Sequence, residues 1–305
     1  MADTTPRTPD AAPRTPDAAP RTPDAVPRTP DAASAAAELD RFRALRHAHV
    51  VGARGPLALV NTQWVDSPQP IWGVPGTWEP TPAGVSGLRV TAAASDGIVV
   101  DGDLVDGSVL VSGDDAITPS SVRFSDTVTG TVVANDDRTS WALRVWDAAS
   151  PDIGRFGEID AFAHDQAWVV TAEFVRSEEG AQVDIRHQAD LELSRPKPLP
   201  GVIRVTLGGV DHELVAFPAG QGDRLQLVFS DGTTGDSTYS VGRFLFPTPS
   251  DDGTIVLDFN RAVLPPCAFS YAFNCPVPPP QNRLTVAIEA GEKTVLDTSG
   301  APLHA

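Results

Sequence analysis

Aspartate–glycine pairs separate short apolar segments in the first half of the chain. The regular spacing of these pairs constrains the fold more than any other feature of the sequence. Pairs beginning at Asp96, Asp101 and Asp106 separate the apolar segments 88–91, 98–100 and 109–111. Asp-Gly favours the positive backbone angles of a two-residue hairpin loop. Further segments at 57–65, 121–124, 130–133 and 141–146 keep a spacing of about ten residues, which is typical of a β-sandwich or barrel.

A similar series fills the second half of the chain. Strands are predicted at 167–175, 182–186, 201–207, 213–217, 225–229, 239–246, 254–259 and 284–288. Gly208-Gly209 predicts another hairpin, and the proline-rich segment 195–200 predicts a connection between strands. No helix is predicted after residue 50. Since 148–152 has the composition of a boundary, we expect an all-β fold with two β-rich subdomains, 55–150 and 151–305, built as sandwich- or barrel-like meanders.

The N-terminal region differs in composition. Residues 6–33 are four copies of a seven-residue unit, Pro-Arg-Thr-Pro-Asp-Ala-Ala, with one Ala replaced by Val. Two prolines per unit exclude helices and sheet ladders, so a disordered tail is predicted over residues 1–36. Ser34 is a good N-cap, and Leu39, Phe42 and Leu45 form an apolar stripe. They predict a helix over 37–52.

The charge of the chain excludes several classes of partner. There are 23 Lys and Arg against 40 Asp and Glu, a net charge of −17. A field of this sign repels phosphates and acidic membranes, so we expect neither a nucleic-acid nor a membrane partner. No membrane span or secretory signal is recognised, which predicts a cytoplasmic protein. No cofactor motif is present, and the six histidines are scattered.

A polar group of side chains accompanies one long loop near the end of the chain. Ile255, Leu257 and Phe259 alternate with Asp258 and Asn260 on the last strand before this loop. Proline-rich loops of this length in compact domains are usually functional. The candidate ligand-binding residues are Asp231, Tyr239, Arg243, Asp258, Asn260, Arg261, Asn282, Glu289 and Glu292. The alternative is a buried network of hydrogen bonds and ion pairs that holds the loop.

Both cysteines of the chain lie in this loop, eight residues apart. Cys267 and Cys275 can be a local disulfide, two structural thiols, or part of a metal or redox site. Structural zinc requires four nitrogen or sulfur ligands, and no neighbouring His or Cys completes such a set. A reactive thiolate requires a nearby cation, for which Arg243 and Arg261 are candidates.

Several motifs around this loop resemble a bacterial family, domain of unknown function (DUF) 1684. They are Asp258-Phe-Asn-Arg-Ala, Pro265-Pro-Cys-Ala-Phe, Cys275-Pro-Val-Pro-Pro, Asn282-Arg-Leu, Ala290-Gly-Glu-Lys, Phe229-Ser-Asp-Gly-Thr-Thr-Gly and Thr238-Tyr-Ser-Val-Gly-Arg-Phe-Leu. The resemblance is dense over residues 140–295 and looser from Gly55. Many members have a Tyr where this chain has Val263. The resemblance implies a common fold and a shared site rather than a mechanism. It also implies that secreted relatives carry the same two cysteines, so a disulfide between Cys267 and Cys275 remains one of the alternatives.

These observations lead to two functional hypotheses. The first is a small-molecule-binding module, open to an enzymatic role, with its site at the Asp258–Glu292 loop. The second is a non-catalytic structural or interaction protein whose polar cluster only stabilises the fold. The two differ in one structural respect. Polar groups around an open cavity favour binding, and polar groups that saturate one another in a closed core favour the structural role.

Overall fold

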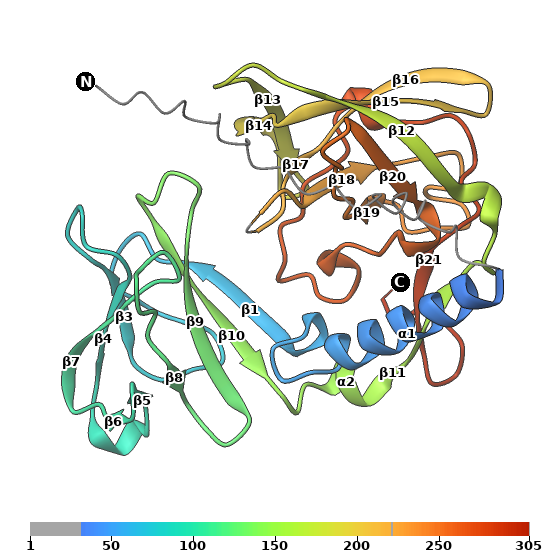
Figure 1. Ribbon diagram of the computed structural model, residues 1–305. Coiled ribbons are helices and arrows are strands. Elements are labelled where there is room, and N and C mark those ends of the chain that lie inside the picture. The colour runs from blue at the N-terminus through green and yellow to red at the C-terminus, as the bar shows by residue number, and fades with distance from the viewer. Residues whose placement is uncertain (1–31, 221, 305) are drawn as a thin grey trace, which may run out of the picture.

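The computed structural model describes residues 32–220 and 222–304. Almost all of the predicted N-terminal tail therefore lies outside the described residues. The protein has an all-β fold with two lobes (Figure 1). The N-terminal lobe comprises β1 to β10, and the C-terminal lobe comprises β11 to β21. No described helix is long and apolar enough to cross a membrane.

The helices are α1 (Ala32–Val50) and α2 (Pro151–Arg155), with 3₁₀ helices η1 (Pro56–Ala58), η2 (Ala94–Asp96), η3 (Gln166–Trp168), η4 (Phe259–Arg261), η5 (Pro266–Ala268) and η6 (Pro280–Asn282). The strands of the N-terminal lobe are β1 (Leu59–Trp64), β2 (Gln69–Pro70), β3 (Thr77–Pro80), β4 (Leu88–Ala92), β5 (Val99–Val100), β6 (Asp103–Leu104), β7 (Gly107–Val111), β8 (Val122–Arg123), β9 (Val128–Ala134) and β10 (Trp141–Asp147). Those of the C-terminal lobe are β11 (Phe156–Ala161), β12 (Val169–Arg176), β13 (Gln182–His187), β14 (Asp190–Pro198), β15 (Gly201–Leu207), β16 (Val210–Val215), β17 (Phe217–Pro218), β18 (Leu225–Phe229), β19 (Arg243–Leu245), β20 (Thr254–Asp258) and β21 (Glu292–Asp297).

The N-terminal lobe is a sandwich of two antiparallel sheets. One has the order β1-β10-β9-β8-β5-β6 and the other β2-β3-β4-β7. Trp78, Leu88, Val90 and Leu143 are buried between them. Asp101 and Gly102 connect β5 to β6 with backbone φ angles of 54° and 97°, so the two-residue hairpin predicted there is confirmed. The other two pairs form no such hairpin: Asp96-Gly97 ends the 3₁₀ helix η2, and Asp106-Gly107 lies between β6 and β7, which belong to different sheets.

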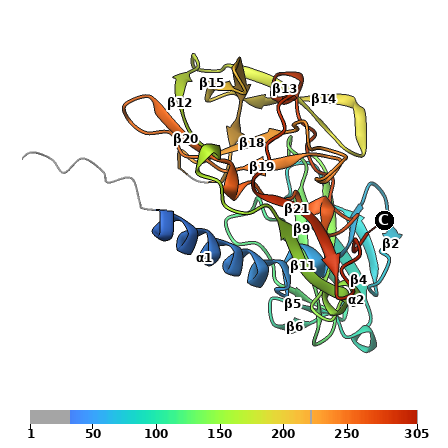
Figure 2. The same ribbon diagram turned by 90° about the vertical axis from the view of Figure 1, so that its right-hand side faces the viewer.

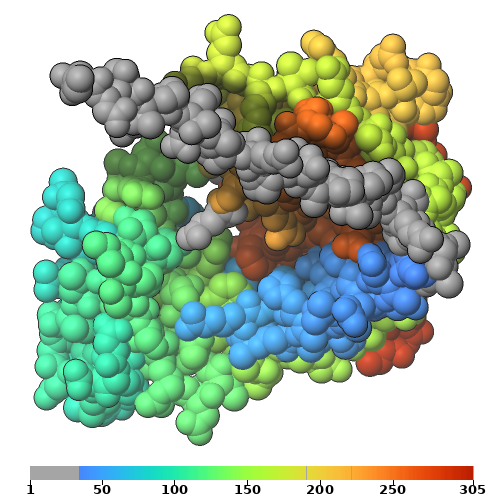
Figure 3. All heavy atoms as spheres, in the orientation of Figure 1, coloured from blue at the N-terminus to red at the C-terminus, as the bar shows by residue number. Residues whose placement is uncertain are grey.

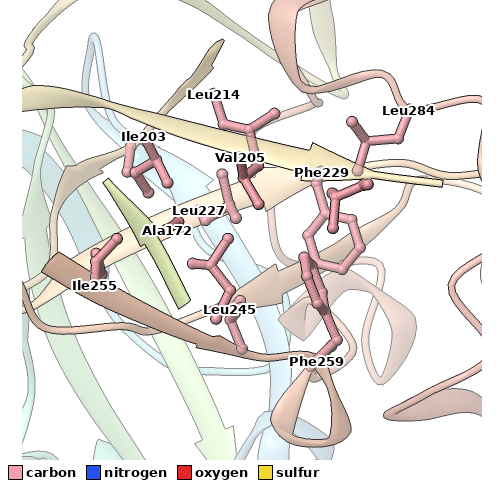
Figure 4. Close-up of a cluster of buried hydrophobic side chains, with 14 of the residues drawn as sticks. Ala172, Ile203, Val205, Leu214, Leu227, Phe229, Leu245, Ile255, Phe259 and Leu284 are labelled. Atoms are coloured by element: carbon pink, nitrogen blue, oxygen red, sulfur yellow. The ribbon is translucent and has the colours of Figure 1, made fainter. Parts of the chain in front are cut away.

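The C-terminal lobe contains its own sheets and its own core. The sheet β16-β15-β12-β20 encloses an apolar core together with β17-β18-β19. In Figure 4, Phe229 and Phe259 lie ring against ring in this core, and their centroids are 5.5 Å apart. Ile255 and Leu257 are buried while Val256 is half exposed, which confirms the alternation predicted for β20. Gly208-Gly209 forms the predicted hairpin between β15 and β16.

The loop from 259 to 291 connects β20 to β21 and joins the two lobes; we call it the β20–β21 loop. Ser270 Oγ donates a buried hydrogen bond to the carbonyl oxygen of Leu59 at 2.6 Å. Phe273 packs edge-on against Trp146 of β10 and lies under the guanidinium of Arg144. Val277 N–H donates to the carbonyl of Arg186 in β13. The loop therefore positions the lobes as well as its own side chains.

The N-terminal helix differs in detail from its prediction. It covers Ala32–Val50 rather than 37–52, so Ser34 lies inside it and is not its N-cap. Alanine has the highest helix propensity, which lets the helix include the alanines before Ser34. Leu39 is buried, but Leu45 is 66% exposed. Steps of three residues drift away from a 3.6-residue period, and the packed face instead continues through Arg46 to Val50. Figure 2 shows α1 running along the C-terminal lobe.

Several strand predictions require correction. Residues 195–198 belong to β14, which pairs only with β13 among the described strands, and prolines are tolerated in such an edge strand. The segment 239–246 forms a strand only over Arg243–Leu245. No strand forms at 284–288, and the chain returns as β21 instead. The short helix α2 follows residue 50, where no helix was predicted; Pro151 at its first turn is preorganised for this.

Candidate functional site

Arg243 is the centre of the polar group predicted from the sequence. Its side chain is entirely withdrawn from solvent at the edge of the aromatic core, with its guanidinium 5.4 Å from the centroid of Phe229. Nη2 donates to Asp231 Oδ2 at 2.7 Å and to the carbonyl of Ile288 at 2.9 Å. Nη1 donates to the carbonyls of Ala290 and Glu292. Burial lowers the pKa of the guanidinium, and the carboxylate of Asp231 opposes that shift.

Local backbone geometry makes this burial feasible. Gly242 precedes Arg243 with a φ of 100°, and a Cβ there would lie 2.4 Å from the carbonyl oxygen of Phe229. Only glycine fits so close to β18 in that conformation. Asp231 is held in turn, because its Oδ1 accepts hydrogen bonds from the backbone N–H and the hydroxyl of Thr233. The ion pair is therefore enclosed by hydrogen bonds on both sides.

Glu292 holds the opposite end of the same segment. Its carboxylate accepts from Arg46 Nε at 3.0 Å and from the backbone N–H of Leu264 at 2.7 Å. Arg46 comes from α1 and also donates to the carbonyl of Leu264 at 2.9 Å. One buried carboxylate thus joins helix α1, the β20–β21 loop and strand β21. Arg46 was not among the predicted residues, because nothing in a helix sequence marks an arginine that faces a buried glutamate.

The remaining predicted residues form separate groups. The side-chain amide of Asn282 bonds to the backbone of Val215 and Val228 through three hydrogen bonds of 2.8 to 2.9 Å. Asn260 bonds to the backbone of Asp165 and to Asp258. Arg261 pairs with Asp258 and with Glu38 near the surface, and Glu289 is exposed. The structure therefore does not gather the nine residues around one opening.

Tyr239 is the predicted residue that lines a cavity. This cavity has a volume of about 330 Å³ and lies between the β20–β21 loop, β21 and the C-terminal residues. We call it the Tyr239 cavity; its lining also includes Ser240, Cys267, Tyr271, Thr294 and His304. The hydroxyl of Tyr239 donates to the carbonyl of Cys267 at 3.2 Å. Burial, followed by the neighbouring Cys267, raises the pKa of Tyr239, so its phenol stays protonated.

Tyr271 and His304 form the outer part of this cavity. Their rings lie 5.0 Å apart at an interplanar angle of 56°. Nε2 of His304 lies 2.9 Å from the carbonyl oxygen of Phe269, which requires that nitrogen to carry the proton. Tyr271 is 73% exposed, whereas His304 is partly buried. Neither was predicted, because they are 33 residues apart in the sequence and belong to none of the motifs; only the prolines and motifs of the β20–β21 loop drew attention to this part of the chain.

Cys267 and Cys275 are free thiols in this structure, and both are buried. The backbone N–H of Cys267 donates to Sγ of Cys275 at 3.2 Å. The hydrogen bond from the Cys275 thiol lowers the pKa of Cys267, with a further contribution from Tyr239. The same hydrogen bond, together with burial, raises the pKa of Cys275. Cys267 is thus the thiol that ionises first, and it is also the one that lines the cavity.

A larger cavity, of about 480 Å³, lies between the lobes. It is lined by Trp64, Asp136, Asp137 and residues of β14, and Figure 3 shows a hollow between the N-terminal lobe and the rest of the molecule. Asp136 already forms an ion pair with Lys197, with 2.5 Å between Oδ1 and Nζ. The Tyr239 cavity is the better candidate site despite its smaller volume, because it combines a thiol, two phenols and an imidazole.

Comparisons with known proteins agree with the motifs. Residues 154–293 match the model of a family described as "Protein of unknown function (DUF1684)", which confirms the resemblance. A similar solved structure is the solution NMR structure of an uncharacterized protein of Haloarcula marismortui. It is 34% identical; the match covers 46% of this chain and 77% of that chain, with a TM-score of 0.38. None of the curated proteins matches the chain.

Proposed function

Because this chain belongs to the DUF1684 family through residues 154–293, and the description of that family names no activity, we propose a function from the geometry of the site. The C-terminal lobe is a binding module for a small polar molecule, and the Tyr239 cavity is its site. The observation that carries the proposal is the lining of this cavity by Tyr239, Cys267, Tyr271 and His304.

The chemistry of the lining defines the class of ligand. Phenol, hydroxyl and imidazole groups offer hydrogen bonds without a fixed carboxylate or guanidinium in the lining. The rings of Tyr271 and His304 offer an aromatic surface at the outside. A small, uncharged or weakly anionic molecule with both polar and apolar parts fits this lining. A thiol with a lowered pKa beside the ligand leaves an enzymatic role open.

In this proposal the buried polar residues hold the backbone next to the cavity in place. Arg243 and Asp231 bind the backbone of residues 288–292, directly before the β21 residues that line the cavity. Glu292 accepts the N–H of Leu264 in the β20–β21 loop. Residues held by such a network keep a cavity in one shape in the absence of ligand. As part of the proposal we assign the protein to the cytoplasm, where both cysteines remain reduced thiols.

The second hypothesis is a non-catalytic structural protein. It is favoured by one observation: Arg243 and Asp231 pair with each other in a closed core rather than facing an opening. In that case the cavity is only a gap left by the packing of the β20–β21 loop against β21. The two hypotheses make different predictions for ligands, because only the first requires the cavity to accept a molecule from solution.

A fragment library screened by ligand-observed NMR against the full chain tests the proposal. Thr294→Phe places a ring in the cavity from β21, and Thr171→Phe places the same ring on the exposed face of β12. We expect fragments that bind the wild type and Thr171→Phe but not Thr294→Phe. If every wild-type hit also binds Thr294→Phe, or if no fragment binds the wild type, the proposed function is wrong and the structural hypothesis stands.

A further inference from the structure

The two thiols of the β20–β21 loop lie against each other rather than apart. The N–H of Cys267 donates to Sγ of Cys275 at 3.2 Å, so the sulfur of Cys275 lies against the backbone of Cys267. Both pack in one apolar cluster with Val228, Phe244 and Val263. Sulfurs held together in this way need little movement of the loop to form a bond, and the cluster excludes water from it.

The two thiols differ in their access to solvent. Cys267 lines the Tyr239 cavity, but Cys275 does not. The thiolate of Cys267 would accept hydrogen bonds from the thiol of Cys275 and from the hydroxyl of Tyr239. Thiol–disulfide exchange requires a thiolate that can reach the sulfur it attacks. Cys267 therefore has the position of an attacking thiol, and Cys275 the position of a resolving thiol.

Arg144 places a positive charge beside this pair from the other lobe. It lies on β10, and its guanidinium is 5.5 Å from the centroid of the Phe273 ring. Its Nε is buried without a hydrogen-bond acceptor in the described part of the chain. Phe273 packs against the apolar cluster that contains Cys275, so the charge of Arg144 lies on the side of that thiol and favours its thiolate. The sequence pointed instead to Arg243 and Arg261 as cations, but Arg243 pairs with Asp231, and Arg261 pairs with Asp258 and Glu38.

We propose that Cys267 and Cys275 are a redox-active dithiol that exchanges with low-molecular-weight disulfides entering through the Tyr239 cavity. This rests on the proposed function, because the disulfide is then the small molecule bound there. The Cys267 thiolate attacks one sulfur of the small disulfide, which forms a mixed disulfide and releases one small thiolate. Cys275, after losing its proton, attacks Sγ of Cys267 and releases the second small thiolate. The protein dithiol is oxidised, and the small disulfide is reduced to two thiols.

Arg144 is a positioning residue in this scheme, because it touches neither the attacking sulfur nor the incoming disulfide. Once Cys267 is in the mixed disulfide, Cys275 must lose its proton within an apolar cluster. The backbone N–H of Cys267 and the charge of Arg144 both favour that ionisation. Arg144→Met should therefore leave the first step unchanged and let the mixed disulfide accumulate, while Arg144→Lys restores its resolution. A purely structural role for Arg144 would not change this intermediate.

The test is incubation of the folded full chain with 2-hydroxyethyl disulfide, followed by intact mass and thiol counting. We expect the wild type to lose both thiols without a retained adduct, reversibly with dithiothreitol. Cys275→Ser should stop at a mixed disulfide on Cys267, and Cys267→Ser should form no adduct. The rate at which the wild type and Cys275→Ser react should rise linearly with disulfide concentration. A plateau in that rate would mean that exchange requires prior unfolding of the protein. A wild type that keeps both thiols, or a Cys267→Ser variant that reacts as fast as Cys275→Ser, overturns the inference.

The result separates this inference from the proposed function. If fragments bind in the cavity but the thiols do not react, only the redox role of the two cysteines is contradicted, and the proposed binding function stands. Exchange that proceeds equally in the wild type and in Thr294→Phe would show that the disulfide does not enter through the cavity, which contradicts the inference and leaves the proposed function to the fragment screen. Exchange that is lost in Thr294→Phe and kept in Thr171→Phe supports both.

Discussion

Arg243 and Asp231 form an ion pair whose two side chains are both fully shielded from solvent, with 2.7 Å between Nη2 and Oδ2. The guanidinium also donates to backbone carbonyls at 288, 290 and 292. Strand β19 is thereby fixed to the end of the β20–β21 loop and the start of β21, which lie 45 or more residues later in the chain. Such a pair stabilises one arrangement of the loop because either partner alone would be a buried, uncompensated charge.

Arg243→Lys should destabilise the fold by about 3 kcal/mol or more, whether or not a ligand is present, because an ammonium cannot make all of these hydrogen bonds. Urea unfolding measures the change. Arg204→Lys is the matched control: Arg204 is half exposed and pairs with Glu213, and surface pairs contribute only about 0–1 kcal/mol. Equal stability losses in the two variants would show that the buried pair does not support the loop.

Phe259→Ala should cost about 3–5 kcal/mol of unfolding free energy, since the ring is fully buried between Phe229 and Trp168 and its removal leaves a cavity. Val256→Ala on the neighbouring strand β20 is the control, because Val256 is 49% exposed. Chemical denaturation monitored by tryptophan fluorescence compares them. A near-neutral effect of Phe259→Ala would place this ring outside the core.

Ser270→Ala should weaken the connection between the lobes. The hydroxyl donates to the carbonyl of Leu59 within a buried contact, and its loss leaves that acceptor unsatisfied, at a cost of about 1–3 kcal/mol. Native-state hydrogen exchange should show faster exchange in β1 and in the β20–β21 loop. Ser299→Ala, at an exposed turn near the C-terminus, provides the comparison. Unchanged exchange in both regions would mean that other contacts hold the lobes together.

The ionisation of Cys267 should depend on its neighbours. Because its pKa is lowered, the thiolate appears at a lower pH than that of an ordinary cysteine and persists above that pH. Ultraviolet absorbance of the thiolate should show this step in the wild type and lose it in Cys267→Ser. In Cys275→Ala the step should move to higher pH, since the main hydrogen bond is gone, and Cys275→Ser should retain part of the shift. A wild-type step at the pH of a free thiol would contradict the arrangement of the pair.

Local signals in the sequence predicted much of the fold. Asp101-Gly102 and Gly208-Gly209 specify their hairpins through backbone angles that few other residues adopt. Strand β20 can be predicted from the sequence because its alternate residues face one core. Leu284, Val286 and Ile288 show the same alternation, yet no strand forms there. The N–H of Ile288 is bound by the carboxylate of Asp231, and its carbonyl by Arg243. Backbone hydrogen bonds still join Leu284 to Ser230 and Val286 to Gly232. At Ile288 side chains take the place of a strand neighbour, which periodicity does not show.

The candidate site could be predicted only in part from the sequence, for a related reason. The loop and Tyr239 were identified from prolines and motifs, but the partners of each side chain come from distant segments. Arg144 is one residue of an ordinary strand, and only the docking of Phe273 brings its charge near Cys275. Asp231, Arg243 and Asn282 were recognised as unusual polar residues, whereas their burial depends on packing that a single sequence does not encode locally.

The central claim is that the Tyr239 cavity opens to Cys267 while the polar network only supports it, and site-resolved alkylation of the folded chain tests this most directly. Iodoacetamide labelling followed by peptide mass mapping should modify Cys267 well before Cys275, at a rate proportional to reagent concentration. Thr294→Phe should slow the labelling of Cys267, and Thr171→Phe should not. Equal labelling of both cysteines, at a rate set by unfolding and unchanged by Thr294→Phe, would show that the thiols are sealed in the core and contradict this account.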